Sequence, residues 1–356
     1  MKIAVGMSGG VDSSVSALLL KQQGFDVIGL FMKNWEETTS QGSCTATKDF
    51  EDVVQVCEML DIPYYSINFV QEYWNLVFSQ FIEELQLGWT PNPDILCNRE
   101  IKFRLFFEKA KQIGATALAT GHYAQTDDQG HLYKSHDLHK DQTYFLYTAQ
   151  QDVLQQVRFP IGHLSKHEVR EIAKKHDLIT AEKKDSTGIC FIGKRDFRLF
   201  ISQYIPYQQG LFLTMDGTSV GTHAGMAYYT IGQRKGLCIG GPGDAWFVVD
   251  KDAKQNIVYV AQGDDHPALY AQTLLGDECS WIGKEPSFPL YCTAKIRYRQ
   301  QEQECIVYKQ AGGTLEVHFT TWQRAITLRQ SIVFYQGNRC LGGARIAAKG
   351  PCRKSL

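Results

Sequence analysis

Short apolar runs alternate with amphipathic stretches along the first 120 residues of the chain. Compact apolar runs predict buried strands, and longer segments with apolar positions every three or four residues predict helices. The expected strands are Lys2–Gly6, Asp26–Met32, Tyr64–Ile67 and Thr116–Thr120, and the expected helices are Val11–Gln23, Asp49–Leu60, Glu72–Leu87 and Phe103–Ile113. Because strands and helices alternate, the pattern predicts an α/β fold in which helices cover both faces of a parallel sheet.

The pattern changes near Lys194, and glycine becomes frequent after Pro206. Short β segments with tight turns are expected there. From about residue 270, alternating runs predict closely spaced strands in a small barrel or sandwich. These runs are Tyr291–Tyr298, Cys305–Tyr308, Leu315–Phe319 and Ser331–Tyr335. We therefore expect three domains, at residues 1–195, 196–265 and 266–356.

Composition narrows the class of protein. No apolar stretch reaches the roughly 18 residues of a membrane span, so neither a membrane anchor nor a signal peptide is expected. The ten cysteines are too sparse for a disulfide scaffold and form no Cys-x-x-Cys pair, which argues against a zinc ribbon and favours a reducing, cytoplasmic location. Net charge is −1, yet the segment from Ala271 onward holds twelve basic and six acidic residues. This local basic excess is compatible with RNA binding or with an ordinary solvated surface.

A glycine-rich turn follows the first predicted strand directly. The segment Gly6-Met7-Ser8-Gly9-Gly10-Val11-Asp12-Ser13-Ser14 leads into a helix-like apolar run. Adjacent glycines let the backbone approach a ligand closely, and the free amides of a first helical turn bind phosphate. No Lys-Ser or Lys-Thr pair follows the glycines, so this is not a Walker loop. A Gly-Gly turn before a capped helix can also be purely structural, but the flanking serines and aspartate favour a phosphate cradle.

Two cysteines lie in unusual loops. Cys97 follows Thr90-Pro91-Asn92-Pro93-Asp94 at the expected start of a helix, where the thiolate form is favoured. Cys190 is bracketed by glycines and lies near Lys183 and Lys184. A lone cysteine is usually a small buried apolar residue. Beside a nucleotide loop, however, two such thiols suggest sulfur carried as a persulfide on one and released by attack of the other.

These segments resemble the tRNA-specific 2-thiouridylases, the MnmA family within the PP-loop ATP-pyrophosphatase superfamily. The matching motifs extend over nearly the whole chain and are Gly6 to Ser14, Gly29 to Trp35, Thr90 to Lys102, Ala119 to Tyr123, Lys140 to Gln142, Asp185 to Gly193, Gly232 to Gly236 and Arg297 to Arg299. The resemblance implies a PP-loop domain of HUP type, a small central β-rich domain and a C-terminal β-barrel that contacts tRNA.

The resemblance also implies a reaction. ATP, with Mg²⁺, would adenylate the C2 oxygen of the wobble uridine, position 34 in the tRNA anticodon stem-loop. A persulfide on Cys190, received from a sulfur-relay protein, would attack C2, and Cys97 would release the sulfur and form a Cys97-Cys190 disulfide. Asp94 would act as acid or base. The implied ATP-binding residues are Gly6, Met7, Ser8, Gly9, Gly10, Val11, Asp12, Ser13, Met32 and Gly121.

Contacts with tRNA are implied for a further set of residues. Asn92, Pro93 and Asp94 would face the target base, and the others would contact RNA nearby: His122, Lys140, Asp141, Gln142, Arg297, Tyr298 and Gln330. Where the family commonly has Thr-Pro-Gly-Gln, this chain reads Thr327-Leu328-Arg329-Gln330, so the Pro-Gly turn is missing from the sequence and the placement of Gln330 is left open. Arg329 is a candidate for an added phosphate contact. A monomer is expected.

Three alternatives stay open at this point. A PP-loop amide-forming synthetase would share the nucleotide loop and need no cysteine pair. A non-catalytic RNA-binding homologue would keep the fold alone. An iron-sulfur cluster held by Asp94, Cys97 and Cys190 is a third alternative, and the persulfide route is favoured over it because no Cys-x-x-Cys pair exists. The tRNA isoacceptors and the sulfur donor are not encoded in any motif we recognise.

Overall fold

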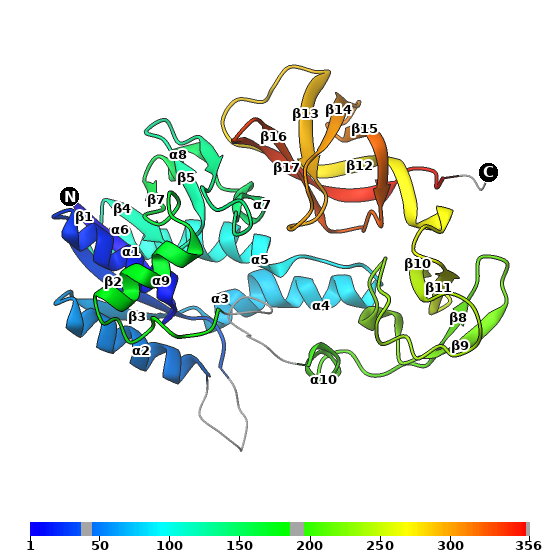
Figure 1. The fold of residues 1–356 in the computed structure, drawn as a ribbon, viewed down its shortest axis with the longest axis horizontal. Coiled ribbons are helices and arrows are strands. Elements are labelled where there is room, and N and C mark those ends of the chain that lie inside the picture. Colours follow the sequence, from blue (N-terminus) through cyan, green and yellow to red (C-terminus); the bar gives the residue numbers. More distant parts are fainter. Residues whose placement is uncertain (37–44, 186–195, 354–356) are drawn as a thin grey trace.

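The computed structural model describes residues 1–36, 45–185 and 196–353, arranged as an α/β part and two β-rich parts (Figure 1). The α/β part is built on a five-stranded parallel sheet in the order β3-β2-β1-β4-β7. Its strands are β1 (Lys2–Met7), β2 (Asp26–Lys33), β3 (Tyr64–Asn68), β4 (Ala117–Thr120) and β7 (Val157–Arg158). The predicted parallel sheet is confirmed.

Helices cover both faces of this sheet because its strands are apolar on both sides. Ile3 and Val5 of β1 pack with residues of α1 (Val11–Gln22), α2 (Thr45–Met59) and α9 (Lys166–Lys175). Ala4 points to the opposite face, where it joins a second core with Phe106 and Ala110. The alternation along one strand therefore feeds two separate apolar layers.

Two long helical segments cross the second face. The first consists of α3 (Val70–Tyr73), a π-helical stretch over Trp74–Phe78 and α4 (Ser79–Gln86). The second consists of α5 (Pro93–Leu96), a π-helical stretch over Cys97–Phe106 and α6 (Phe107–Gln112). The predicted start of this second helix, at Phe103, was wrong by ten residues. Asn92 caps the helix by accepting a hydrogen bond from the Asp94 amide (3.2 Å), and Pro93 occupies the first helical position, where no N–H is needed.

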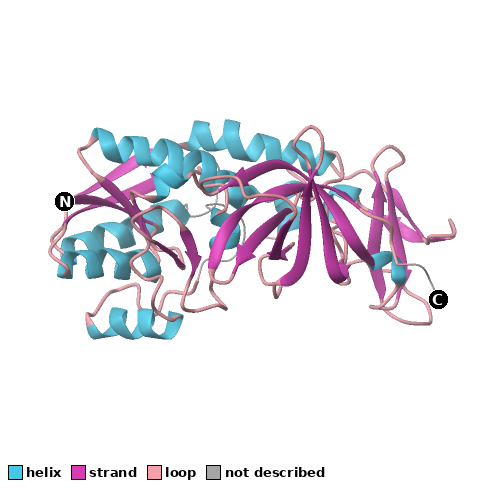
Figure 2. Ribbon diagram, turned by 90° about the horizontal axis from the view of Figure 1, so that it is seen from above, coloured by secondary structure: helices cyan, strands magenta, loops and turns pink. Residues whose placement is uncertain are grey.

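The central β-rich part is a four-stranded sheet in the order β10-β11-β8-β9. Its strands are β8 (Gly210–Leu213), β9 (Ser219–His223), β10 (Trp246–Asp252) and β11 (Ile257–Gln262), preceded by the short helix α10 (Phe197–Ile201). Figure 2 shows this sheet beyond the barrel, at the end of the molecule opposite the N-terminus.

The C-terminal part is a closed six-stranded antiparallel barrel, so the predicted small barrel or sandwich is a barrel. Its strands are β12 (Tyr270–Trp281), β13 (Leu290–Lys295), β14 (Gln303–Lys309), β15 (Leu315–Arg324), β16 (Ser331–Gln336) and β17 (Arg339–Lys349). Pairing of β12 with β17 closes it. A hairpin of the α/β part, β5 (Ala124–Thr126) with β6 (Leu132–Lys134), extends the barrel sheet by pairing with β17.

The helices of residues 1–36, 45–185 and 196–353 include none that combines the length and apolar character needed to cross a bilayer.

Candidate functional site

The glycine-rich turn joins β1 to α1 at the carboxyl edge of the parallel sheet. Gly9 has φ +72°, and a Cβ at this position would lie 2.5 Å from the Asp49 carbonyl oxygen, so glycine is required. The Ser8 amide donates to Ser13 Oγ (3.2 Å), which itself donates to the Gly10 carbonyl (3.0 Å). The loop is thus held in one conformation, with the amides of the first turn of α1 at its centre, where the helix dipole favours an anion.

Gly121 packs directly against this turn. It follows β4, and a Cβ at this position would lie 2.8 Å from the backbone carbon of Asp12 and 2.8 Å from the nitrogen of Ser13. Met32 is buried near the end of β2, on the other side of β1. The ends of three neighbouring strands therefore meet around the turn, where α/β sheets bind ligands. The structure brings the sequence-predicted nucleotide residues together.

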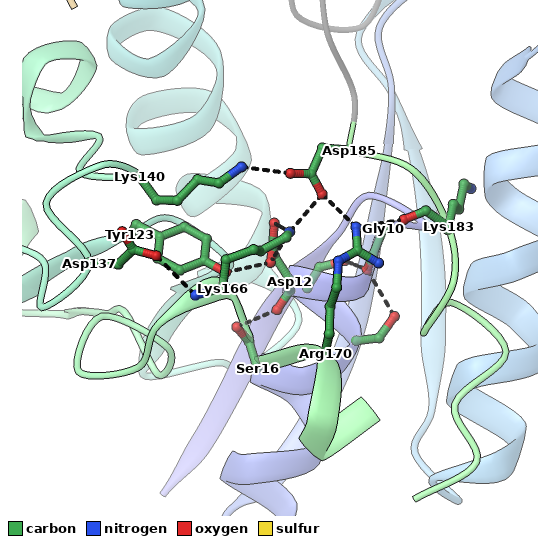
Figure 3. Close-up of polar contacts among 12 residues, drawn as sticks. Gly10, Asp12, Ser16, Tyr123, Asp137, Lys140, Lys166, Arg170, Lys183 and Asp185 are labelled. Atoms are coloured by element: carbon green, nitrogen blue, oxygen red, sulfur yellow. Dashed lines mark hydrogen bonds and ion pairs between the residues drawn. The ribbon is translucent and has the colours of Figure 1, made fainter. Parts of the chain in front are cut away.

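Asp12, in the first turn of α1, accepts hydrogen bonds from two residues that were not predicted from the sequence (Figure 3). Tyr123 Oη donates to its Oδ1 (2.9 Å), and Lys166 Nζ lies 2.7 and 2.8 Å from its two carboxylate oxygens. Burial and the neighbouring Asp12 carboxylate raise the pKa of Tyr123, so this phenol stays protonated and remains a donor. Lys166 is at the start of α9, which begins with a capping box formed by Ser165 and Glu168.

Lys166 also contacts Asp185 (2.8 Å), which receives two further cations, Lys140 (2.8 Å) and Arg170 (2.9 Å) (Figure 3). Partial burial alone would raise the pKa of Asp185, but the hydrogen bonds from Lys140 and Lys166 lower it to about 2. Asp185 is therefore ionised at neutral pH. Sequence reasoning identified Lys140 as an RNA contact and did not anticipate this ion cluster beside the nucleotide loop.

Cys97 lies one turn into the helix that begins at Pro93, and its side chain is completely buried. Asp94 is half-buried in the first turn of the same helix. The neighbouring Asn98 is buried and donates from Nδ2 to the Phe145 carbonyl (3.0 Å), which fixes this part of the helix. Cys190, predicted as the second thiol, lies outside the described residues, so its position relative to Cys97 stays a prediction, as does the alternative metal cluster.

The loop before Cys97 is held by the barrel. Gln330 donates from Nε2 to the Thr90 carbonyl (2.7 Å), and the Arg329 guanidinium stacks over the Trp89 ring at 3.8 Å. The Gln330 amide donates to the Thr327 carbonyl (3.3 Å), and Arg329 has φ +69°, so residues 327–330 form a turn with a left-handed third residue. The turn is therefore present although the Pro-Gly pair is missing from the sequence. Arg329 occupies the position that favours glycine.

His122 follows Gly121 at the edge of the sheet and is partly buried. Its Nδ1 lies 2.8 Å from Thr120 Oγ1, and its Nε2 lies 3.4 Å from Lys102 Nζ. Burial and, second, the positive charge of Lys102 hold the pKa of His122 well below its usual value. The imidazole is therefore neutral at pH 7 and can exchange hydrogen bonds with a base without carrying charge.

The other predicted RNA contacts lie at the junction between the α/β part and the barrel. Asp141 is 4% exposed and accepts hydrogen bonds from the Ser135 amide (3.1 Å) and the Thr143 hydroxyl (2.7 Å). Gln142 is half-buried and accepts a hydrogen bond from the Tyr123 amide (2.9 Å). These hydrogen bonds hold both side chains inside the protein. The two residues would therefore influence RNA binding by positioning the surrounding backbone.

Two barrel residues predicted to touch RNA hold the barrel to the other two parts, Arg297 to the central part and Tyr298 to the α/β part. Arg297 donates to the carbonyls of Ile231 (3.2 Å) and Ala325 (2.7 Å), which links the barrel to the central part. Tyr298 packs on Phe145, with ring centroids 4.5 Å apart. Both side chains are half-buried.

A glycine-rich strand-turn-helix cradle at the edge of a parallel sheet, without a Walker lysine, is the arrangement of a nucleotide-binding PP-loop domain. Family models match the chain in three segments: the tRNA methyl transferase HUP domain at residues 1–194, the tRNA methyl transferase PRC-barrel domain at 198–262 and the aminomethyltransferase beta-barrel domain at 271–346. The chain is 59% identical to a tRNA-specific 2-thiouridylase MnmA of Protochlamydia amoebophila, with 98% of this chain and 94% of the relative covered. It is 53% identical to the enzyme of the same name from Bacillus subtilis, with 97% and 94% covered. The chain belongs to the tRNA-specific 2-thiouridylase family.

Proposed function

We propose that this protein catalyses the ATP-dependent 2-thiolation of the wobble uridine, position 34, of tRNA. The observation that carries the proposal is the fixed phosphate cradle at Ser8–Ser13 in a chain that also holds a buried thiol, Cys97, one turn into a helix. Relatives that share more than half of its residues over nearly its full length are named for this activity.

Activation of the base is the first step. A uracil C2 carbonyl is a poor electrophile and its oxygen is a poor leaving group, but as an AMP ester the oxygen departs readily. Binding of ATP at the turn, between Met32 and Gly121, directs its phosphates toward the amides of the first turn of α1. Mg²⁺, which accompanies ATP, supplies charge neutralisation at the phosphates. The C2 oxygen attacks the α-phosphorus and pyrophosphate leaves.

Sulfur transfer follows. A persulfide on Cys190, formed by a persulfide-carrying relay protein, attacks C2 through its terminal sulfur, and AMP leaves with the C2 oxygen. The Cys97 thiolate then attacks the Cys190 sulfur, which breaks the sulfur-sulfur bond, leaves sulfur on C2 as 2-thiouridine and forms a Cys97-Cys190 disulfide. A reductant reopens the disulfide. Asp94, in the turn before Cys97, exchanges the proton at the base edge.

Recognition of a base splayed out of the anticodon loop fits the polar residues near Cys97. Asn92, Pro93 and Asp94 are proposed to face the base, while His122, Lys140 and Gln330 contact RNA nearby. Asp141, Gln142, Arg297 and Tyr298 are proposed to shape this surface from the junction that they hold. The enzyme is proposed to act as a cytoplasmic monomer.

The test separates activation from sulfur transfer. Wild-type protein, Cys97→Ser and Cys57→Ser are compared for tRNA-dependent pyrophosphate release and for 2-thiouridine formation. Cys57 is a suitable control because it is buried in the sheet core and burial raises its pKa to about 12, so its thiol is inert. We expect Cys97→Ser to release pyrophosphate but to make no 2-thiouridine, and Cys57→Ser to do both. Thiolation by Cys97→Ser at the wild-type rate would refute the role of this thiol.

A further inference from the structure

Three cations from two distant segments converge on one carboxylate beside the nucleotide turn. Lys166 and Arg170 lie one turn apart on α9, and Lys140 lies in the loop after the β5-β6 hairpin. Their nitrogens are 2.8 to 2.9 Å from the Asp185 oxygens. Figure 3 shows the three side chains pointing toward Asp185 from separate sides. Such an arrangement of ammonium and guanidinium donors suits any oxyanion of similar size, including a phosphate.

This cluster is continuous with the phosphate cradle through Lys166. Its ammonium contacts both Asp185 and the two oxygens of Asp12, and Asp12 is in the first turn of α1. The Lys166 side chain is only 13% exposed, so solvent screens these contacts weakly. Asp137 also belongs to this cluster and accepts a hydrogen bond from the Lys166 amide (3.0 Å), so three carboxylates balance the three cations. A phosphate that binds to these cations must therefore replace one of the carboxylates that they contact.

The two carboxylates that share Lys166 are held differently. Asp12 is fixed in a helix and receives a second donor from Tyr123. Asp185 lies outside any helix or strand, in the segment that follows α9. Arg170 is oriented independently of Asp185 because it also donates to the carbonyls of Ala181 and Lys183. Removal of the Asp185 carboxylate would therefore leave Lys166 and Arg170 in place.

We propose that Lys166 and Arg170 form an anion site for the pyrophosphate end of ATP, and that the Asp185 carboxylate competes with phosphate for these two cations. The inference rests on the proposed function only in taking ATP as the substrate. It adds two residues of α9 to the nucleotide site and gives Asp185 the role of an internal competitor, which phosphate displaces. Because the pKa of Asp185 is about 2, the competition is between two anions and does not depend on protonation at neutral pH.

Isothermal titration calorimetry with inorganic pyrophosphate, and then with ATP and Mg²⁺, tests this without tRNA or a sulfur source. Lys166→Met and Arg170→Met should each weaken pyrophosphate binding by about tenfold or more, because each removes a charge-assisted hydrogen bond. Asp185→Asn should tighten binding several-fold, since the amide no longer competes as an anion. Lys174→Met is the matched control, because Lys174 lies on the same helix but is paired with Glu171 and Glu182 on the surface.

The carboxylate variant separates this proposal from a purely structural role. If the cluster merely held the fold together, Asp185→Asn would weaken binding or leave it unchanged, and either result would overturn the proposal. Retention of wild-type affinity by Lys166→Met would overturn it as well. Lys166→Arg keeps the charge and should restore most of the affinity that Lys166→Met loses. If Asp185→Asn binds pyrophosphate more tightly but the wild-type protein makes no 2-thiouridine, the anion site is upheld and the proposed function is refuted.

Discussion

The close approach of Gly121 to the nucleotide turn gives a quantitative prediction. In Gly121→Ala the new methyl group would lie 2.8 Å from backbone atoms of Asp12 and Ser13, whereas ordinary contacts begin at 3.4 Å. The end of β4 and the first turn of α1 must therefore separate by about 0.6 Å, the difference between these two distances. No flexible side chain can absorb the clash, because the atoms that it meets belong to the backbone.

The displacement acts on the amides that bind phosphate. A shift of about 0.6 Å lengthens a typical 2.9 Å hydrogen bond to about 3.5 Å, which is beyond the useful range. Loss of one hydrogen bond to a charged group costs about 1.5–3 kcal/mol, which corresponds to at least about a tenfold weaker ATP affinity. Gly121→Ala should therefore bind ATP at least about tenfold more weakly than the wild type while it retains its fold.

Calorimetric titration with ATP and Mg²⁺ measures this effect, and near-ultraviolet circular dichroism verifies the fold. Gly240→Ala is the control, since a Cβ at Gly240 meets no atom within 4 Å and φ there lies outside the left-handed region. It should bind ATP as the wild type does. A folded Gly121→Ala protein with ATP affinity within about twofold of the wild type would refute the assignment of this contact to the nucleotide site.

Two other variants test the turn at Arg329 and the buried amine of Lys251. A residue with a Cβ, such as arginine or alanine, loses about 1–2 kcal/mol of folding free energy in the left-handed conformation of position 329. Glycine avoids this cost but loses about 0.4–1 kcal/mol because its unfolded chain has more conformational entropy. Arg329→Gly should therefore be more stable than Arg329→Ala by about 0.5–1 kcal/mol. The denaturant concentrations at the unfolding midpoints of the two variants are compared. A midpoint for Arg329→Ala that equals or exceeds that of Arg329→Gly would show that the backbone at this position is not strained. Burial lowers the pKa of Lys251 from 10.5 to about 8, so between these pH values the unfolded chain binds a proton that the folded chain does not. Wild-type stability should therefore rise from pH 8 to 10.5 relative to Lys251→Met, and equal pH slopes for both proteins would contradict the burial of this amine.

Features that depend on neighbouring residues were predictable from the sequence. The first strand, the glycine turn and the first helix follow each other within the span from Lys2 to Gln22, and each has a local signature. The place of Gly121 near Ser13 was implied by the family resemblance, and it agrees with the shared edge at which the ends of parallel strands lie. Four of the six barrel strands, β13 to β16, were predicted from short apolar runs, whereas β12 and β17 were not given as separate strands.

Features that join distant segments had no local signal. Lys166 reaches Asp12 across 154 positions, and its helix looks like any amphipathic helix. The pairing of β6 with β17 depends on how two domains pack, and Cys340 opposite Leu132 carries no pattern that predicts it. Burial of Asp141 also could not be predicted, because an aspartate among Lys140 and Gln142 resembles an exposed polar run. The helix start at Pro93 was predicted too late, near Cys97 from the loop motif and at Phe103 from the apolar pattern, which the polar Asn98-Arg99-Glu100 run interrupts.

The central claim is that ATP cleavage at the glycine turn activates uridine 34 for sulfur. Purified protein is incubated with unmodified tRNA, ATP, Mg²⁺ and a persulfide source, and the tRNA nucleosides are then analysed by mass spectrometry. We expect 2-thiouridine at position 34, formed only when ATP is present and absent when Cys97→Ser replaces the wild type. Formation of 2-thiouridine without ATP, or AMP and pyrophosphate release with no thiolated nucleoside under these conditions, would contradict it.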